Sequence, residues 1–319
     1  MTTEPETASR GLPYHLILLG GRSGWWRSAV GILSLVVVGG LLAPALVSIP
    51  FVAGLAVTGH SGASIERMLD LDDPTPLGLA YLNLALAAAI PLTWLIIRVL
   101  HGLRPRWLAS VLPRLRWRYL FVCVGLALVA LIATIVVSAL LPAQDTGPAV
   151  TGEVNDFTST TRDFLLVVLF LTPLQAAGEE YAFRGYLTQA FGGIFRHPVP
   201  AVVAPAILFA LAHGIGQSIP IFFDRLAFGL VAGTLVILTG GLEAGIAMHV
   251  LNNWLAFGLA LAFGDMGSSL NPTGGSWWAI PVTLTQSLVY LGLALFVARR
   301  MGLATRADPI VLVAPQRRV

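Results

Sequence analysis

Long apolar runs separated by short polar segments dominate the 319-residue sequence. Each run extends over about 18 residues or more, which is the length an α-helix needs to cross the hydrocarbon core of a bilayer. The pattern therefore predicts an all-α, polytopic membrane protein with about eight transmembrane helices. They cover approximately residues 28–58, 76–98, 119–141, 163–190, 199–218, 222–239, 241–263 and 277–298.

The composition excludes a soluble globular enzyme. Hydrophobic residues make up 56% of the chain and charged residues 11%, with a mean hydropathy of +0.81, whereas soluble domains carry about 25% charged residues. So few charges cannot cover a water-facing surface, but they suffice for the loops between membrane helices.

All 19 basic residues are arginines. Most of them lie in alternate loops and in the terminal segments, so the positive-inside rule predicts that both termini are cytoplasmic. The intervening loops at 59–75 and 142–162 collect acidic residues instead, Asp145 among them. The segment 104–118 mixes arginines with apolar residues, and a positively charged loop is preferred here to an interfacial helix because Pro113 interrupts the helical periodicity.

The charge pattern also limits the partners and the location. The chain has no lysine, which excludes Schiff-base and Walker-type lysine chemistry. No long basic run with interleaved aromatic residues is present, so no nucleic-acid partner is expected. Arginine without lysine is typical of GC-rich bacterial genomes, and we expect a multi-pass protein of the bacterial plasma membrane in contact with lipids.

Ionisable side chains inside three predicted spans mark a candidate site. A charge at the centre of a span costs about 2.5 to 3.5 kcal/mol even on lenient insertion scales, so each is a functional candidate. The alternative is that these polar groups only hold helices together. The residues are Glu179, Glu180 and Arg184 in the fourth span, His213, four residues after Phe209, in the fifth, and His249 and Asn253 in the seventh.

Helical spacing divides these residues between two roles. Glu180 and Arg184 are four residues apart and are predicted to form an ion pair, while Glu179 is turned by about 100° and stays available. His249 and Asn253 are also four apart and point to one side of their helix. Helix rise places all three clusters at similar depth, which predicts that they form one site.

A carboxylate beside an imidazole in a partly dry cavity can take a proton from water. A second imidazole with an amide can stabilise the oxyanion that forms when the water attacks a peptide carbonyl. Water-mediated peptide hydrolysis therefore fits these residues. A zinc ion held by Glu179, His213 and His249 is an alternative source of activated water, although the usual zincin spacing is absent, and a metal-free mechanism is equally compatible.

These motifs resemble those of the CPBP family of intramembrane proteases. That family includes the CAAX prenyl endopeptidases and bacteriocin-processing or self-immunity proteins, and it is described by Glu-Glu-x-x-x-Arg, Phe-x-x-x-His and His-x-x-x-Asn. The likeness covers about residues 160–263. It implies that Glu179 and His213 activate water, that His249 and Asn253 form the oxyanion site, and that Glu180, Arg184 and Phe209 support this geometry.

The resulting hypothesis is a membrane endopeptidase that cuts a peptide or protein substrate near the cytoplasmic side. The predicted organisation is a cytoplasmic segment at 1–27, N-terminal transmembrane helices at 28–160, a CPBP-like catalytic core at 161–263, and a last helix with a cytoplasmic tail at 264–319. Two other functions stay open: a proton- or cation-coupled transporter, which also needs intramembrane ionisable groups, and a non-catalytic immunity or scaffold protein.

Overall fold

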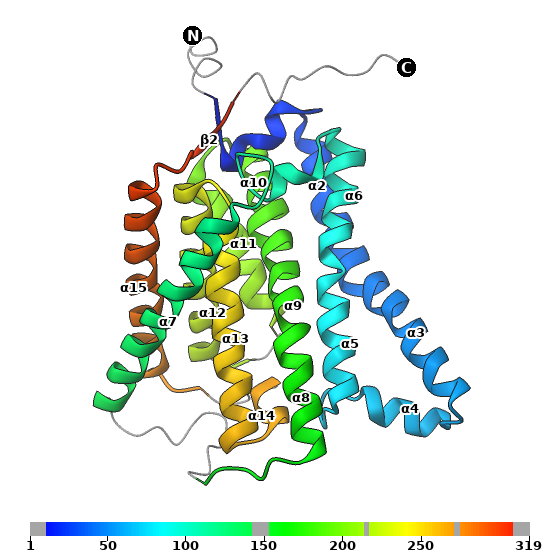
Figure 1. Ribbon diagram of the computed structural model, residues 1–319. Helices are drawn as coiled ribbons and strands as arrows, with labels where there is room; N and C mark the ends of the chain where they lie inside the picture. Colours follow the sequence, from blue (N-terminus) through cyan, green and yellow to red (C-terminus); the bar gives the residue numbers. More distant parts are fainter. Residues whose placement is uncertain (1–10, 142–152, 214–216, 271–274, 309–319) are drawn as a thin grey trace.

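A computed structural model describes residues 11–141, 153–213, 217–270 and 275–308 of the chain (Figure 1). Three arginines of the predicted terminal segments and one aspartate of the predicted acidic loop lie outside the described residues, namely Arg10, Arg317, Arg318 and Asp145.

The prediction of an all-α polytopic membrane protein is confirmed. Within the described residues, 7 helical segments are long and apolar enough to cross a membrane. Three of these segments consist of several consecutive helices. Trp25–Val57 contains α2 (Trp25–Ser34), the π-helix η2 (Leu35–Leu42) and α3 (Ala43–Val57), and Pro76–His101 contains α5 (Pro76–Ala87) and α6 (Ala89–His101). Ser159–Phe195 contains α8 (Ser159–Phe170), α9 (Thr172–Glu179), the π-helix η4 (Glu180–Leu187) and α10 (Thr188–Phe195). Continuous ones are α7 Trp117–Leu140, α12 Ile219–Thr239, α13 Glu243–Phe263 and α15 Ala279–Arg300. The short helices α4 (Gly62–Leu69) and α14 (Met266–Leu270) lie at the lower end of the bundle in Figure 1, away from the two chain termini.

The fifth predicted span, residues 199–218, is shorter than expected. Helix α11 covers Pro198–Ala212 and has 15 residues, which gives a length of about 22 Å against the roughly 30 Å of a hydrocarbon core. The polar residues His213, Gln217 and Ser218 interrupt the apolar run, and Ser218 is already the N-cap of α12. His213 therefore lies just past the end of a helix rather than within a transmembrane segment.

One end of the bundle is covered by short segments from three parts of the chain, and we call it the capped end. The cover consists of the 3-10 helices η1 (Tyr14–Gly20) and η3 (Pro105–Leu108), the loop that follows η3, and the two-stranded antiparallel sheet of β1 (Leu12–Pro13) and β2 (Arg306–Ala307). Figure 1 shows these segments above the helix ends. Trp107 and Leu108 are buried in the protein, so the segment 104–118 is a loop folded onto the bundle and does not form an interfacial helix.

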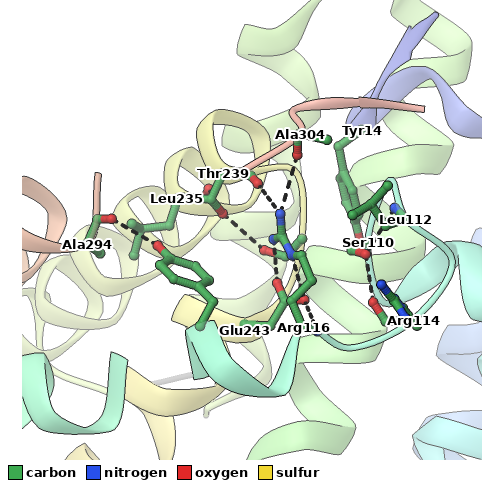
Figure 2. Close-up of polar contacts among 12 residues, drawn as sticks. Tyr14, Ser110, Leu112, Arg114, Arg116, Leu235, Thr239, Glu243, Ala294 and Ala304 are labelled. Atoms are coloured by element: carbon green, nitrogen blue, oxygen red, sulfur yellow. Dashed lines mark hydrogen bonds and ion pairs between the residues drawn. The ribbon is translucent and has the colours of Figure 1, made fainter. Parts of the chain in front are cut away.

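A buried ion pair fastens this loop to α13 (Figure 2). The Arg116 guanidinium donates from Nε to Oε1 of Glu243 at 2.9 Å and from Nη2 to Oε2 at 2.6 Å. Its Nη1 donates to the carbonyl oxygens of Thr239 at 2.8 Å and Ala304 at 3.3 Å. One side chain thereby joins the start of α7, the end of α12, the start of α13 and the segment after α15.

Helix α9 packs closely on α5 where the chain reaches Glu179. A Cβ atom added at Gly178 would lie 2.4 Å from the carbonyl oxygen of Leu86 and 2.9 Å from Cα of Ala87. Only glycine permits this approach, because backbone atoms cannot yield as a side-chain tip can. The contact fixes the position of α9 immediately before the two glutamates.

Candidate active site

The two adjacent glutamates lie at a change of helical geometry. Glu179 is the last residue of α9, and Glu180 is the first residue of the π-helical segment η4. Both side chains are buried, with residue exposures of 8% and 0%. π-helical turns are rare and occur frequently at functional sites, so the position of this segment supports a functional role for its first residues.

Glu180 is held by two partners through one oxygen. Its Oε1 accepts a hydrogen bond from Nη1 of Arg184 at 3.0 Å and lies 3.0 Å from Nδ1 of His249. All three residues are buried. The ion pair expected from the four-residue spacing of Glu180 and Arg184 is therefore present, and α13 brings a histidine to the same oxygen.

His249 lies between the two glutamates. While its Nδ1 faces Glu180, its Nε2 lies 3.5 Å from Oε2 of Glu179. A carboxylate oxygen only accepts hydrogen bonds, so Nδ1 carries the proton that Glu180 accepts. The imidazole thus connects the carboxylate that is buttressed by arginine with the one that is not.

Gln175 links Glu179 to Asn253. Its Nε2 donates to Oε1 of Glu179 at 2.9 Å, and its Oε1 accepts from Nδ2 of Asn253 at 3.0 Å. None of the three sequence motifs contains this residue. The signal was nevertheless available, because Gln175 is a buried amide four residues before Glu179 in a predicted span.

Phe209 contacts all three motifs. Its ring centroid lies 4.1 Å from the guanidinium carbon of Arg184, 4.4 Å from the ring of His213 and 6.0 Å from the ring of His249. Phe228 of α12 completes the aromatic wall, with its centroid 5.1 Å from that of His249. A desolvated cation over an aromatic face gains about 2 kcal/mol, so the phenylalanines help to retain the buried arginine.

His213 occupies the exposed side of this cluster. Its Nδ1 lies 2.8 Å from the carbonyl oxygen of Phe209, which can only accept a hydrogen bond. Nδ1 is therefore the protonated nitrogen, and Nε2 of a neutral imidazole is the free acceptor. The charge of Glu179 is close enough to act on His213, but no hydrogen bond or ion pair joins them in the described part of the chain. The structure thus places His249, rather than His213, directly beside Glu179.

The buried cluster carries an excess of negative charge. Glu179 and Glu180 face the single guanidinium of Arg184, and His249 lies between the two carboxylates. Oε2 of Glu179, Oε2 of Glu180 and Nη2 of Arg184 are buried without a hydrogen-bond partner among the described residues. Buried polar atoms are normally satisfied by protein or water, so each of these three atoms is a place where a buried water molecule can bind.

The predicted metal ligands do not come together as a set of three. Glu179 and His249 are adjacent, whereas no hydrogen bond or ion pair joins His213 to either of them in the described part of the chain. Across the described ranges there is no group of three or more His, Cys, Asp or Glu residues arranged to hold a metal ion. The donor set shown here does not fit a three-ligand zinc site.

Buried apolar side chains close the cluster toward the capped end. Leu108 and Leu242 are fully buried, and both lie near Gly185 of η4. Tyr14 of η1 is also fully buried and donates its hydroxyl to the carbonyl oxygen of Leu108. The exposed member of the cluster, His213, is on the side away from this cover.

Comparison with known proteins adds an independent observation. Residues 161–255 match the family model of Rce1-like proteins, described as type II CAAX prenyl endopeptidase Rce1-like. This segment is similar to Rce1-like proteins. It contains all three motifs of the site, and it confirms the resemblance to the CPBP family on which the sequence analysis rests.

Within curated proteins, the chain is similar to YyaK of Bacillus subtilis (strain 168), which is described as an uncharacterized protein. The two are 28% identical over 146 residues, which are 43% of this chain and 49% of the relative, so the chain spans about half the length of YyaK. No solved structure matches. The membrane-spanning helices are those of a multi-pass membrane protein.

Proposed function

We propose that this protein is an intramembrane endopeptidase in which Glu179 and His213 activate a water molecule for attack on a peptide bond. The observation that carries the proposal is the environment of the Glu179 carboxylate, whose Oε2 has Nε2 of His249 at 3.5 Å as its neighbour. Gln175 holds Oε1 of that carboxylate, while Oε2 is buried without a hydrogen-bond partner among the described residues. A carboxylate positioned in this way is suited to act as a general base.

In this mechanism the water gives one proton to Glu179. Its other hydrogen stays on the water oxygen and donates a hydrogen bond to Nε2 of His213. The water oxygen forms a bond to the peptide carbonyl carbon, and the carbonyl oxygen becomes an oxyanion. When that intermediate collapses, the C–N bond breaks and the proton on Glu179 passes to the leaving amine. The products are a carboxylic acid and an amine, as peptide hydrolysis requires.

His249 and Asn253 supply donors for the oxyanion in this proposal. With its second proton, His249 presents an Nε2–H on the Glu179 side while Glu180 holds its Nδ1. Asn253 uses one amide hydrogen on Gln175 and retains another. One such donor typically contributes about 2.7 to 4 kcal/mol to transition-state stabilisation. Glu180 and Arg184 act by orienting His249 rather than by touching the substrate.

We also propose that the capped end faces the cytoplasm of a bacterial cell. The Arg-rich loop at 104–118 and the pair Arg299 and Arg300 at the end of α15 support this orientation through the positive-inside rule. A reporter that is active only in the cytoplasm should be active when fused after residue 319. Activity of a periplasm-specific reporter at this position would reverse the orientation.

The experiment uses the full-length protein in detergent with a panel of quenched-fluorescent peptides that includes a farnesylated peptide with a CAAX end. Glu179→Gln and His213→Ala should each lower the cleavage rate by about 10²-fold or more, with unchanged melting temperature. Glu66→Gln is the matched control, because Glu66 is exposed on α4. Equal cleavage by Glu179→Gln and wild type would refute the assignment.

The same preparation separates the two other functions. A transporter would take up a radiolabelled ion or solute in proteoliposomes without cutting any peptide. A non-catalytic immunity or scaffold protein would keep its cellular phenotype in the Glu179→Gln variant. Comparative mass spectrometry of membrane peptides from cells with wild-type or Glu179→Gln protein would then identify the natural substrate.

A further inference from the structure

Arg225 is a charged residue in a membrane-spanning helix that the mechanism above does not use. It lies in the second turn of α12, and its Nε is buried without a hydrogen-bond partner in the described part of the chain. The acidic group nearest to its guanidinium is Asp224, at 3.8 Å between Nη1 and Oδ2. Asp224 also accepts a hydrogen bond from the hydroxyl of Thr283 on α15, so it is shared with another partner.

The packing of α11 on α12 places Arg225 beside the candidate active site. The helices are antiparallel, and a Cβ atom added at Gly229 would lie 2.9 Å from Cβ of Ala206. Phe228 is the residue before Gly229 on α12, and Phe209 is about one turn after Ala206 on α11. The centroids of their rings are 5.7 Å apart. One more turn in the same direction leads to Arg225 on α12 and to His213 on α11.

This register puts Arg225 and His213 on facing sides of the same helix pair. In agreement with it, the positive charge of Arg225 acts on His213. Arg225 is also one turn from Phe228, whose ring contacts His249. Arg225 therefore lies on the His213 side of the catalytic cluster.

The energetics require a partner for this group. An arginine in a transmembrane segment is expensive unless it is paired, so such residues mark functional sites. The planar guanidinium offers several donors in a fork that matches the two oxygens of a carboxylate. Among the described residues the guanidinium has only the weak contact with Asp224, and its Nε has no hydrogen-bond partner, so it retains donors for an anionic ligand.

We propose that Arg225 binds a carboxylate of the peptide substrate beside His213 and selects peptides that carry a negative charge near the cleaved bond. The proposal rests on the endopeptidase function described above. The carboxylate comes either from a free C-terminus or from an aspartate or glutamate side chain, and Arg225 recognises the same chemistry in both cases.

The test compares matched peptides with the full-length protein in detergent. One quenched-fluorescent sequence is made with a C-terminal acid or amide, and a second with Asp or Asn next to the cleaved bond. Wild type should cleave the anionic member of at least one pair with a kcat/KM at least tenfold higher, mainly through KM. The pair that shows this preference identifies the source of the carboxylate.

Substitution then assigns the preference to the residue. In Arg225→Gln the ratio between anionic and neutral peptides should fall to about one, and Arg225→Lys should restore part of it. Arg162→Gln should keep the wild-type ratio, because Arg162 is exposed and pairs with Asp163. Equal rates of wild type on both members of both pairs would overturn the role of Arg225 while leaving the endopeptidase intact. Cleavage of no peptide in the panel would instead count against the endopeptidase itself.

Discussion

Nδ1 of His249 lies 3.0 Å from Oε1 of Glu180, the same oxygen that accepts a hydrogen bond from Nη1 of Arg184 at 3.0 Å. One buried carboxylate oxygen thereby holds a side chain from its own helix and a side chain from α13. Because His249 also faces Glu179, the position of the whole cluster depends on the charge of Glu180.

Replacing the charge of Glu180 should destabilise the folded protein as well as slow peptide cleavage. Glu180→Gln leaves the Arg184 guanidinium buried without its counter-charge, and breaking a buried ion pair in this way costs about 3 to 5 kcal/mol. We expect a clearly lower melting temperature in detergent. The double variant Glu180→Gln with Arg184→Leu should regain most of the stability without regaining cleavage. Double-variant stability as low as that of Glu180→Gln would contradict this account.

Gly245 should be irreplaceable for a local reason. A Cβ atom at this position would lie 2.6 Å from Oε2 of Glu180, and that carboxylate cannot move freely because Arg184 and His249 hold it. Gly245→Ala should therefore reduce peptide cleavage at least tenfold. Gly258→Ala on the same helix is the control, since no atom lies within 4 Å of a Cβ there. Cleavage assays on both purified variants decide the question, and equal activity would show that the site tolerates the displacement.

The ion pair between Arg116 and Glu243 should contribute far more to stability than an exposed one. Arg116→Leu leaves the Glu243 carboxylate buried and unpaired, which should cost about 3 to 5 kcal/mol. Arg162→Leu breaks an exposed pair with Asp163, whose side chains have relative exposures of 60% and 47%, and should cost at most about 1 kcal/mol. Melting temperatures of the two variants measure the difference. Similar decreases in melting temperature for both variants would mean that the buried pair does not stabilise the position of α13.

His15 should make the capped end sensitive to acid. Burial, with the nearby positive charges of His197 and Arg306, lowers the pKa of His15 to about 4, against about 6.5 in an unfolded chain. Between these values the unfolded state binds more protons, so stability is full above about pH 6.5 and decreases as the pH falls toward 4. His15→Leu should weaken this dependence, as measured by melting temperature from pH 7 to pH 4. The control His60→Leu should keep the wild-type slope, and an unchanged slope in His15→Leu would exclude this residue as its cause.

Local spacing predicted those features of the site that depend on a single helix. The four-residue separation of Glu180 and Arg184 was sufficient to predict their ion pair, because side chains at this distance share a helix face. The apolar runs were sufficient to predict most spans. The early end of α11 was missed, since Phe209 and His213 fit a helical spacing whether or not the helix continues beyond them.

Contacts between distant segments could not be predicted in the same way. Glu243 is an acidic residue at a span boundary, and Arg116 is one of several arginines in a loop. Only the folded chain shows that they meet. The same is true of His249, whose depth was compatible with the glutamates but whose position between them depends on how closely α13 approaches η4. Gln175 is the opposite case, because its spacing from Glu179 contained the information and was overlooked.

The pairing of β1 with β2 has a consequence for biosynthesis. Leu12 and Pro13 are among the first described residues to leave the ribosome, and their partners Ala307 and Arg306 are among the last. The N-terminal strand therefore remains without its partner until α15 has been made, after the other described membrane-spanning helices. Closure of the sheet, together with the bond from Arg306 to the carbonyl oxygen of Gly11 at 3.1 Å, therefore comes after the synthesis of α15 and joins the two ends of the described bundle late in assembly.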